Sequence, residues 1–258
     1  MLLVNGCSYT YGDELDDPIN ERWSTHLSSL LGSKIENIGS CGASNSKIFR
    51  TTMDALLSNG NDITGVIIIW SAFERCEFVN LSTHHLFWKE GNPEEDPWMQ
   101  VSPSRLDSRQ YKSVTKKVEG LKAYYNDLYT SEGGIWQTVN YMYWIKNLCD
   151  HFNIDCMQGW FHEAMLARFR RVFSRINHQN MGGRLLKLEE EISGKLRVLP
   201  GYQLIGCPGT DYQTFNMFTE RGGYSRKPEL HPGPEAHEGY AHYLFDIIKE
   251  HNLFEEKI

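Results

Sequence analysis

One serine and one histidine, far apart in the chain, each have neighbours suited to nucleophilic catalysis. Ser8 lies in a glycine-flanked turn, residues 6–12, directly after a short apolar run. Glycine there lets the chain turn sharply and lets a substrate approach the backbone. His231 precedes a Pro-Gly pair and follows Glu229 by two residues. Because a histidine can take the serine proton while a carboxylate fixes its tautomer, we predict Ser8 as nucleophile, His231 as base and Glu229 as orienting acid.

Two further loops hold groups suited to stabilising the oxyanion of an acyl-transfer reaction. Gly42 could present its N–H to the oxyanion, and Asn45 could donate its amide. Either Asn45 or Ser44 could cap the following helix. Ser71 and Arg75 follow the most apolar run of the chain, where Arg75 either pairs with Glu74 or faces a substrate. We predict that Gly42, Asn45, Ser71 and Arg75 contact the oxyanion or the substrate.

Apolar runs that alternate with helical patterns indicate how these loops are positioned. The expected strands are residues 2–4, 34–38, 66–70 and 154–160. Helices are expected to begin near residues 20, 44 and 234, and residues 119–152 are expected to be helical with a break at Gly133-Gly134. Residues 198–230 are expected to be mostly loop. This alternation predicts a single domain with a three-layer α/β/α, doubly wound, flavodoxin-like parallel sheet. Ligands bind at the carboxyl ends of such strands, where Ser8, Gly42 and Ser71 are expected.

Two segments are expected as insertions in this domain. Residues 80–118 contain several prolines and scattered aromatic residues, and predict a lid or substrate loop. Phe87, Trp88 and Trp98 in this segment either stack on a sugar ring or pack within the lid. Residues 163–197 are rich in charge and predict a helical insertion.

The composition argues against several classes of function. The net charge is −7 and no basic stripe is present, which argues against a nucleic-acid partner. No apolar stretch approaches the roughly 18 residues of a membrane span, and no signal-peptide pattern is visible, so we expect a cytoplasmic chain. The six cysteines include no CxxC pair, so we predict free thiols. The predicted chemistry needs no metal or organic cofactor.

These motifs, in this order, resemble the blocks of the SGNH/GDSL hydrolase family. Residues 6–12 (GCSYTYG) resemble the first block, Gly-Asp-Ser-x-x-x-Gly, which follows the first strand. Residues 37–45 (NIGSCGASN) resemble the second block, whose glycine, here Gly42, helps to form the oxyanion hole. Residues 229–237 (ELHPGPEAH) resemble the last block, in which an acid and a histidine lie close together. The resemblance implies a serine esterase that acts through an acyl-enzyme, and we expect short acyl or O-acetyl esters, also on carbohydrate, as substrates.

Three departures from the family pattern affect the predicted site. Cys7 stands where the family has an aspartate, and Glu229 is one methylene longer than the usual acid. Residues 70–75 (WSAFER) occupy the place of the third block, Gly-x-Asn-Asp, without its asparagine. Losing one oxyanion donor costs roughly 100- to 1000-fold in rate, unless a neighbouring group substitutes for it.

Four alternatives stay open at this point. Cys7 could be the nucleophile in place of Ser8, since thiolates are better nucleophiles. Metal-ligand types also occur at His84, His85, His231, Glu235 and His237, although their spacing matches no standard zinc pattern. The cleft could bind a glycan, an acyl ligand or a protein partner without turnover, or transfer the acyl group to an alcohol if a lid excludes water.

Overall fold

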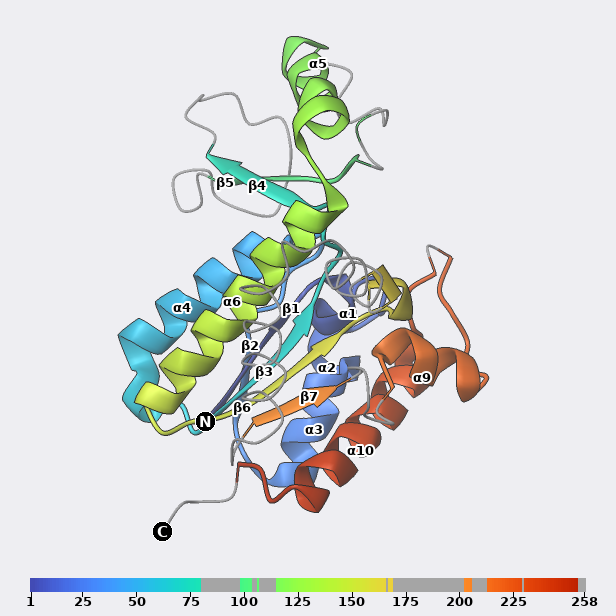
Figure 1. Cartoon of the computed structure of the whole chain (residues 1–258). Coiled ribbons are helices and arrows are strands. Elements are labelled where there is room, and N and C mark those ends of the chain that lie inside the picture. Colours follow the sequence, from blue (N-terminus) through green and yellow to red (C-terminus); the bar gives the residue numbers. More distant parts are fainter. Residues whose placement is uncertain are drawn as a thin grey trace.

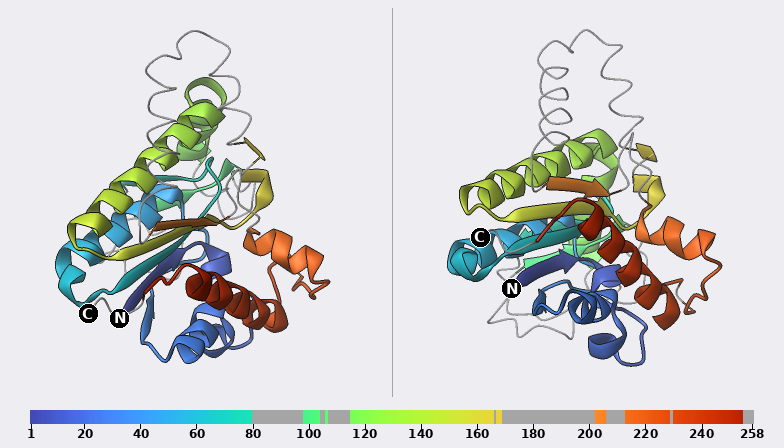
Figure 2. Two further views of the ribbon diagram at one scale, coloured as in Figure 1. Left: turned by 60° about the horizontal axis from the view of Figure 1, so that its bottom comes forward. Right: turned by 90° about the horizontal axis from the view of Figure 1, so that it is seen from below.

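A parallel sheet organises the chain in the computed structural model, with the strand order β2-β1-β3-β6-β7 among the described residues. The structure describes residues 1–79, 98–103, 106, 115–165, 167, 168, 202–205, 213–228 and 230–254. The strands of this sheet are β1 (Leu2–Gly6), β2 (Ile35–Asn37), β3 (Gly65–Trp70), β6 (Asp155–Trp160) and β7 (Tyr202–Ile205). Helices cover both faces of the sheet (Figures 1 and 2). The predicted three-layer, doubly wound α/β fold is therefore confirmed, and the strand order is that of flavodoxin-like sheets.

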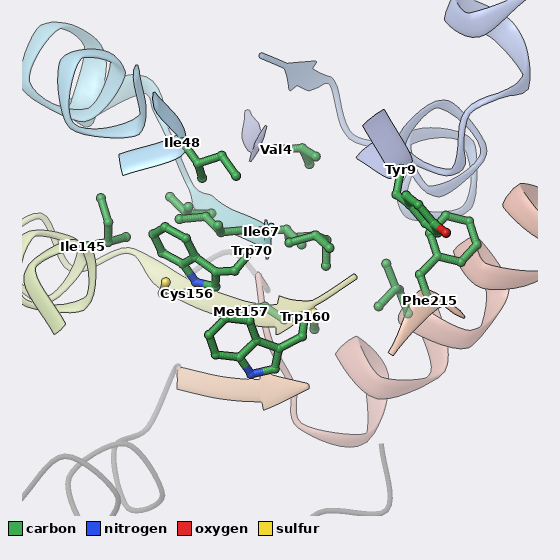
Figure 3. Packing of buried hydrophobic residues seen from close by; sticks show 14 of the residues in the cluster. Val4, Tyr9, Ile48, Ile67, Trp70, Ile145, Cys156, Met157, Trp160 and Phe215 are labelled. Carbon is green, nitrogen blue, oxygen red and sulfur yellow. The ribbon is translucent and has the colours of Figure 1, made fainter. Parts of the chain in front are cut away.

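The inner strands of the sheet are buried along their whole length. β3 is a continuous apolar run rich in β-branched residues, as a parallel strand covered on both faces requires. Trp70 and Trp160 are paired at the carboxyl ends of β3 and β6, and both are fully buried in the core (Figure 3). The Trp70 indole donates a hydrogen bond to Gln158 Oε1 at 2.8 Å. The loops that follow these strands therefore start from firmly held positions.

Two pairs of helices form the outer layers. The described helices are α1 (Ser8–Tyr11), α2 (Pro18–Glu21), α3 (Trp23–Leu31), α4 (Asn45–Asn59), α5 (Thr115–Ala123), α6 (Ser131–His151), α9 (Phe215–Arg221) and α10 (Pro234–Glu250), with a 3₁₀ turn η1 (Gly60–Asp62) and a π-helical turn η4 (Tyr124–Leu128). α3 and α10 pack together on one face of the sheet, and α4 and α6 on the other (Figure 2). No helix in the described part of the chain is long and apolar enough to cross a membrane.

Capping residues set most of the helix ends. The Ser44 side chain accepts a hydrogen bond from the first turn of α4, and Gly32 ends α3 in the left-handed conformation. Asn20, in contrast, does not begin α3, because the short helix α2 comes first. Asp17 caps α2 by accepting from Asn20 N at 3.2 Å, and α3 then starts after Arg22.

Two other expectations about secondary structure were incomplete or wrong. Residues 198–230, expected as mostly loop, contain β7 and α9. β7 has only four residues and forms a strand because it pairs with β6. Local sequence patterns do not predict such a pairing. The break in residues 119–152 does not fall at Gly133-Gly134. It falls at Thr130, whose hydroxyl accepts from Gly133 N at 3.0 Å, so both glycines lie in the first turn of α6.

A separate hairpin lies beyond the carboxyl edge of the main sheet (Figure 1). β4 (Cys76–Val79) pairs antiparallel with β5 (Trp98–Val101). β5 is a described part of the segment 80–118 that was expected to form a lid. Most of that segment, including Phe87 and Trp88, and most of the insertion 163–197 lie outside the described residues, so their predicted roles stay predictions.

His237 is a buried histidine that joins α10 to α3. Its ring is fully buried, and its Nδ1 accepts a hydrogen bond from Trp23 N at 3.1 Å, at the start of α3. Burial, with smaller contributions from the nearby His26 and His231, lowers the pKa of His237 to about 3. His237 therefore stays neutral in the folded chain at pH values where it is protonated in the unfolded chain.

This pKa difference predicts a loss of stability in mild acid. Above pH 6.5 the histidine is neutral in both states, and below that value the unfolded state gains a proton first. Each pH unit between the two pKa values costs about 1.4 kcal/mol, so the free energy of unfolding should fall by about 2 kcal/mol from pH 6.5 to pH 5. Urea unfolding at several pH values measures this slope. His237→Asn keeps an acceptor near Trp23 N without a titrating ring and should flatten the slope, whereas the exposed control His242→Asn should not. Equal slopes in wild type and His237→Asn would contradict this assignment.

Candidate active site

Ser8 begins helix α1 directly after β1, at the carboxyl edge of the sheet. Its side chain is buried, with 5% of the residue exposed, and its N–H has no partner within the helix because it is the first residue. Gly6 keeps the turn tight, since a Cβ on it would lie 2.8 Å from Ile69 O. Gly12, with φ of +90°, ends α1. The amide and hydroxyl of Ser8 are therefore held together on a short, firmly placed helix.

The loop that carries Gly42 is hydrogen-bonded to β1 and α1. Ser40 N donates to Gly6 O at 3.1 Å, and the Asn37 side chain donates to Thr10 O at 2.8 Å. Gly42 has φ of +70°, a conformation that residues with a Cβ rarely adopt. Glycine at this position is therefore required by the turn, which lies beside the helix of Ser8.

Three of the predicted oxyanion residues form one hydrogen-bonded cluster between β3 and α4. Asn45 Oδ1 accepts from Ser71 N at 2.7 Å, and Asn45 Nδ2 donates to Ser71 O and to Thr138 Oγ1, at 3.2 and 3.0 Å. Arg75 Nη1 donates to Ser71 Oγ at 2.8 Å and contacts Ala43 O at 3.5 Å. Because both hydrogens of its amide are used in this way, Asn45 positions Ser71. Arg75 is the group that reaches from the end of β3 to the neighbouring glycine loop.

Two residues named among the alternatives have other surroundings. Glu74 forms an ion pair with Arg168 at 3.1 Å, while Arg75 contacts Ser71 and Ala43. The suggested Glu74–Arg75 pair is therefore replaced by two separate interactions. Cys7 is fully buried within the hydrophobic core, so its thiol does not face solvent.

His231 lies against the helix that carries Ser8. Its Nδ1 is 2.8 Å from Glu14 Oε2, and its backbone N–H donates to the same oxygen at 3.3 Å. Its Nε2 lies 3.8 Å from Asp13 Oδ2, and its ring centroid lies 5.4 Å from that of Tyr9. Tyr9 follows Ser8 within α1, and Asp13 and Glu14 follow the end of that helix. The predicted base and nucleophile, from opposite ends of the chain, therefore adjoin the same short helix.

Within the described residues, no hydrogen bond joins Ser8 to His231. Contacts between a nucleophile and its base are often long before substrate binds and tighten in the complex. Glu229 lies outside the described residues, so its predicted role stays a prediction. Glu14 is the carboxylate that contacts His231 Nδ1, and it lies outside the predicted catalytic motifs.

The loop of His231 is braced by a compact set of hydrogen bonds. Lys227 N donates to His231 O and Leu230 N donates to Lys227 O, both at 2.9 Å. Arg226 Nη1 donates to Leu230 O at 2.7 Å, and its Nη2 donates to Asn216 Oδ1 in α9 at 2.7 Å. The imidazole is therefore held from two sides, by its own loop and by the turn after α1.

Glu14 has an unusual backbone conformation for its residue type. Its φ is +66°, and the left-handed region costs a residue with a Cβ roughly 1–2 kcal/mol. Strain of this kind often accompanies a functional contact that requires it. The next residue, Leu15, is buried and anchors the turn. The sequence signal available for Glu14 was an acidic pair directly after the serine block.

No protein-family model matches the sequence, and no curated protein sequence matches it. Solved structures match its fold over nearly the whole chain. They include TesA (TM-score 0.51, 10% identity, 96% of this chain and 98% of that one), the psychrotrophic esterase EstA from Pseudoalteromonas sp. (0.50, 12%, 96% and 96%) and a protein described as lipolytic and of the G-D-S-L family from Desulfitobacterium hafniense DCB-2 (0.50, 9%, 95% and 98%). At such identities the likeness establishes the fold alone. The parallel sheet, the serine at the start of the first helix and these structural matches agree, and the chain has the SGNH/GDSL-type hydrolase fold.

Proposed function

We propose that this protein is a serine ester hydrolase with Ser8 as nucleophile and His231 as general base. The observation that carries the proposal is the contact between His231 Nδ1 and Glu14 Oε2, 2.8 Å long, beside the helix that Ser8 begins. An ionised carboxylate only accepts hydrogen bonds, so this contact puts the proton on Nδ1 and leaves the Nε2 lone pair available. A histidine in this tautomer is suited to take a proton from a serine hydroxyl.

In the proposed reaction, Ser8 Oγ attacks the carbonyl carbon of the ester while its proton passes to His231 Nε2. The tetrahedral intermediate collapses when the alcohol leaves with that proton, and an acyl-serine remains. A water molecule then attacks the acyl carbon, giving its proton to His231, and Ser8 recovers the proton as the acid departs. Glu14 stabilises the imidazolium at each stage. Asp13, 3.8 Å from Nε2, adds negative charge on the other side of the ring. Glu229 is the rival candidate for the orienting acid.

The oxyanion in this mechanism is held by the amides of Ser8 and Gly42 and by the guanidinium of Arg75. We assign Arg75 as the third donor because its guanidinium contacts Ser71 Oγ and Ala43 O, next to Gly42. A charged donor stabilises a developing oxyanion strongly in a site with little water. Asn45 acts indirectly by holding Ser71 in place.

The burial of the nucleophile favours a small acyl group. Only 5% of Ser8 is exposed, so the acyl part must fit between the helix and the surrounding loops. We therefore propose acetyl or another short acyl group, with the larger alcohol part of the ester outside this pocket. An O-acetylated carbohydrate meets this description.

Labelling with a fluorophosphonate probe, followed by peptide mapping, tests the proposal. The wild-type chain should be labelled on Ser8, because only a serine activated by a base reacts rapidly with such probes. Ser40→Ala is the matched control, because it removes a nearby serine hydroxyl. The contact of Ser40 with β1 is made by its backbone N–H, which the substitution keeps. A folded chain that takes up no label would favour a non-catalytic ligand-binding protein, and a label on Cys7 would favour the thiol alternative.

A further inference from the structure

A cavity is lined by residues of α4, α6, the turn η4 and the β4–β5 hairpin. Figure 1 shows how these elements are arranged. Its volume is about 360 Å³, within the range of sites for small ligands. The described residues that line it do not include Ser8. The aromatic members of the lining are Phe49, Phe78, Trp98, Tyr124 and Tyr141. The cavity is thus a separate concave site with an unusual number of flat apolar surfaces.

Ring contacts hold these aromatic side chains in place. Phe49 of α4 is stacked on Tyr141 of α6, with centroids 4.4 Å apart and an angle of 14° between the rings. Phe78 of β4 meets Tyr124 edge to face, with centroids 5.6 Å apart. Aromatic pairs with these geometries stabilise each other. The cavity walls are therefore preorganised, which reduces the conformational entropy that the protein loses when a ligand binds.

The charged groups in the cavity neutralise each other. Arg50 makes two contacts with the Glu77 carboxylate, from Nη2 at 2.7 Å and from Nε at 3.3 Å, and Gln100 Nε2 donates to the same carboxylate at 2.8 Å. The Arg50 guanidinium also lies 5.0 Å from the centre of the Trp98 ring. Among the described lining residues, Arg50 and Glu77 are the only acidic or basic side chains. Because Arg50 is already paired with Glu77, it attracts an anionic ligand less strongly than an isolated cation would.

Aromatic walls together with paired polar groups suit a sugar ring better than an acyl chain. An acyl chain would cover the ion pair without replacing its contacts with water, at a cost in free energy. A pyranose ring has an apolar face of C–H groups that packs on an aromatic ring. It also has hydroxyl groups that both donate and accept, so they can meet the Arg50–Glu77 pair and the exposed amide of Gln137.

The cavity is linked to the segments that carry the proposed oxyanion donors. Gln100 Oε1 accepts from Ser44 N at 2.9 Å, two residues after Gly42. Cys76, which lines the cavity, directly follows Arg75. Adjacent Cα atoms are about 3.8 Å apart, so this wall begins beside the proposed site. One extended ligand can therefore reach both.

We propose that this cavity binds a neutral pyranose ring of an oligosaccharide. If the proposed esterase function holds, the cavity is also the subsite for the alcohol part of the ester; this assignment rests on the proposed function.

Isothermal titration calorimetry with three ester-free probes, xylohexaose, cellohexaose and N-acetylchitohexaose, tests the proposal. At least one should bind the wild-type chain and the Ser8→Ala variant equally. Trp98→Ala should weaken this binding about tenfold or more, the equivalent of about 1.4 kcal/mol. Gln137→Ala, at an exposed helical position that should not disturb folding, should weaken it about threefold. Trp144→Ala is the matched control, because Trp144 is 58% exposed and does not line the cavity.

The outcomes separate this proposal from the esterase proposal. If none of the three oligosaccharides binds, or if Trp98→Ala and Gln137→Ala both bind like wild type, the sugar subsite is overturned, whatever the fluorophosphonate result. If binding depends on Trp98 but Ser8 takes up no label, the cavity stands as a sugar site and its role in ester hydrolysis is overturned.

Discussion

Replacement of Ser8 by alanine should lower kcat/KM for a short acyl ester such as 4-nitrophenyl acetate by about 10⁴- to 10⁶-fold. In the proposed mechanism the Ser8 hydroxyl forms the covalent bond to the acyl group, and alanine has no nucleophilic atom in its place. The remaining rate should come from binding and from the oxyanion donors, which the substitution leaves in place. Steady-state kinetics on purified wild type and variant measure this effect.

Two controls make the result specific to the nucleophile. Ser8→Ala removes one buried oxygen atom, and its thermal unfolding should stay within a few degrees of wild type, which excludes misfolding as the cause. Cys7→Ala tests the neighbouring thiol, whose side chain is fully buried in the core, and should keep most of the activity. Full turnover by Ser8→Ala, or loss of activity in Cys7→Ala alone with its fold intact, would refute the assignment of Ser8.

Replacement of Glu14 by glutamine should lower kcat about 10³- to 10⁴-fold with little change in KM. The Glu14 carboxylate accepts from both Nδ1 and the backbone N–H of His231. A glutamine amide can instead donate to Nδ1, which favours the tautomer whose Nε2 carries the proton and cannot accept one from Ser8. It also removes the negative charge that stabilises the imidazolium.

Glu229→Gln is the matched partner of this experiment, since it makes the same chemical change in the acid that the sequence indicated. With Glu14 as the orienting acid, Glu229→Gln should keep kcat within about tenfold of wild type, while Glu14→Gln should not. The reverse order would restore Glu229 to the catalytic role. Comparable losses in both variants would indicate that the two carboxylates share the histidine.

The parts of the fold that were predictable are those encoded by local patterns. The apolar β-branched run at residues 66–70 is buried in β3, and Ser44 and Gly32 bound their helices as capping chemistry requires. Alternation of such runs with helices was sufficient for the doubly wound architecture. The short strand β7 was not predictable, because four residues carry no period of their own and its structure depends on pairing with β6.

The candidate site likewise contains residues whose roles follow from the local sequence and residues whose roles depend on distant partners. The glycines around Ser8 and at position 42 could be interpreted locally, because a tight turn or a positive φ demands glycine wherever it occurs. The roles of Asn45 and Arg75 could not, because each depends on partners outside its own segment. The Asn45 amide bonds Ser71, at the end of β3, and Thr138, in α6, so it positions the site instead of facing a substrate.

The sequence by itself determined the fold class and the positions of Ser8, Gly42 and His231 at strand ends and helix starts. These follow from short-range constraints on backbone conformation and burial, which act on a few consecutive residues. Only the tertiary structure decided that the described partner of His231 is Glu14. That contact joins side chains 217 residues apart in the sequence, and it forms because the turn after α1 and the loop before α10 meet at the edge of the sheet. A spacing of two residues suggested Glu229, but hydrogen bonds depend on distance in space, which the packing of α1 against the His231 loop sets.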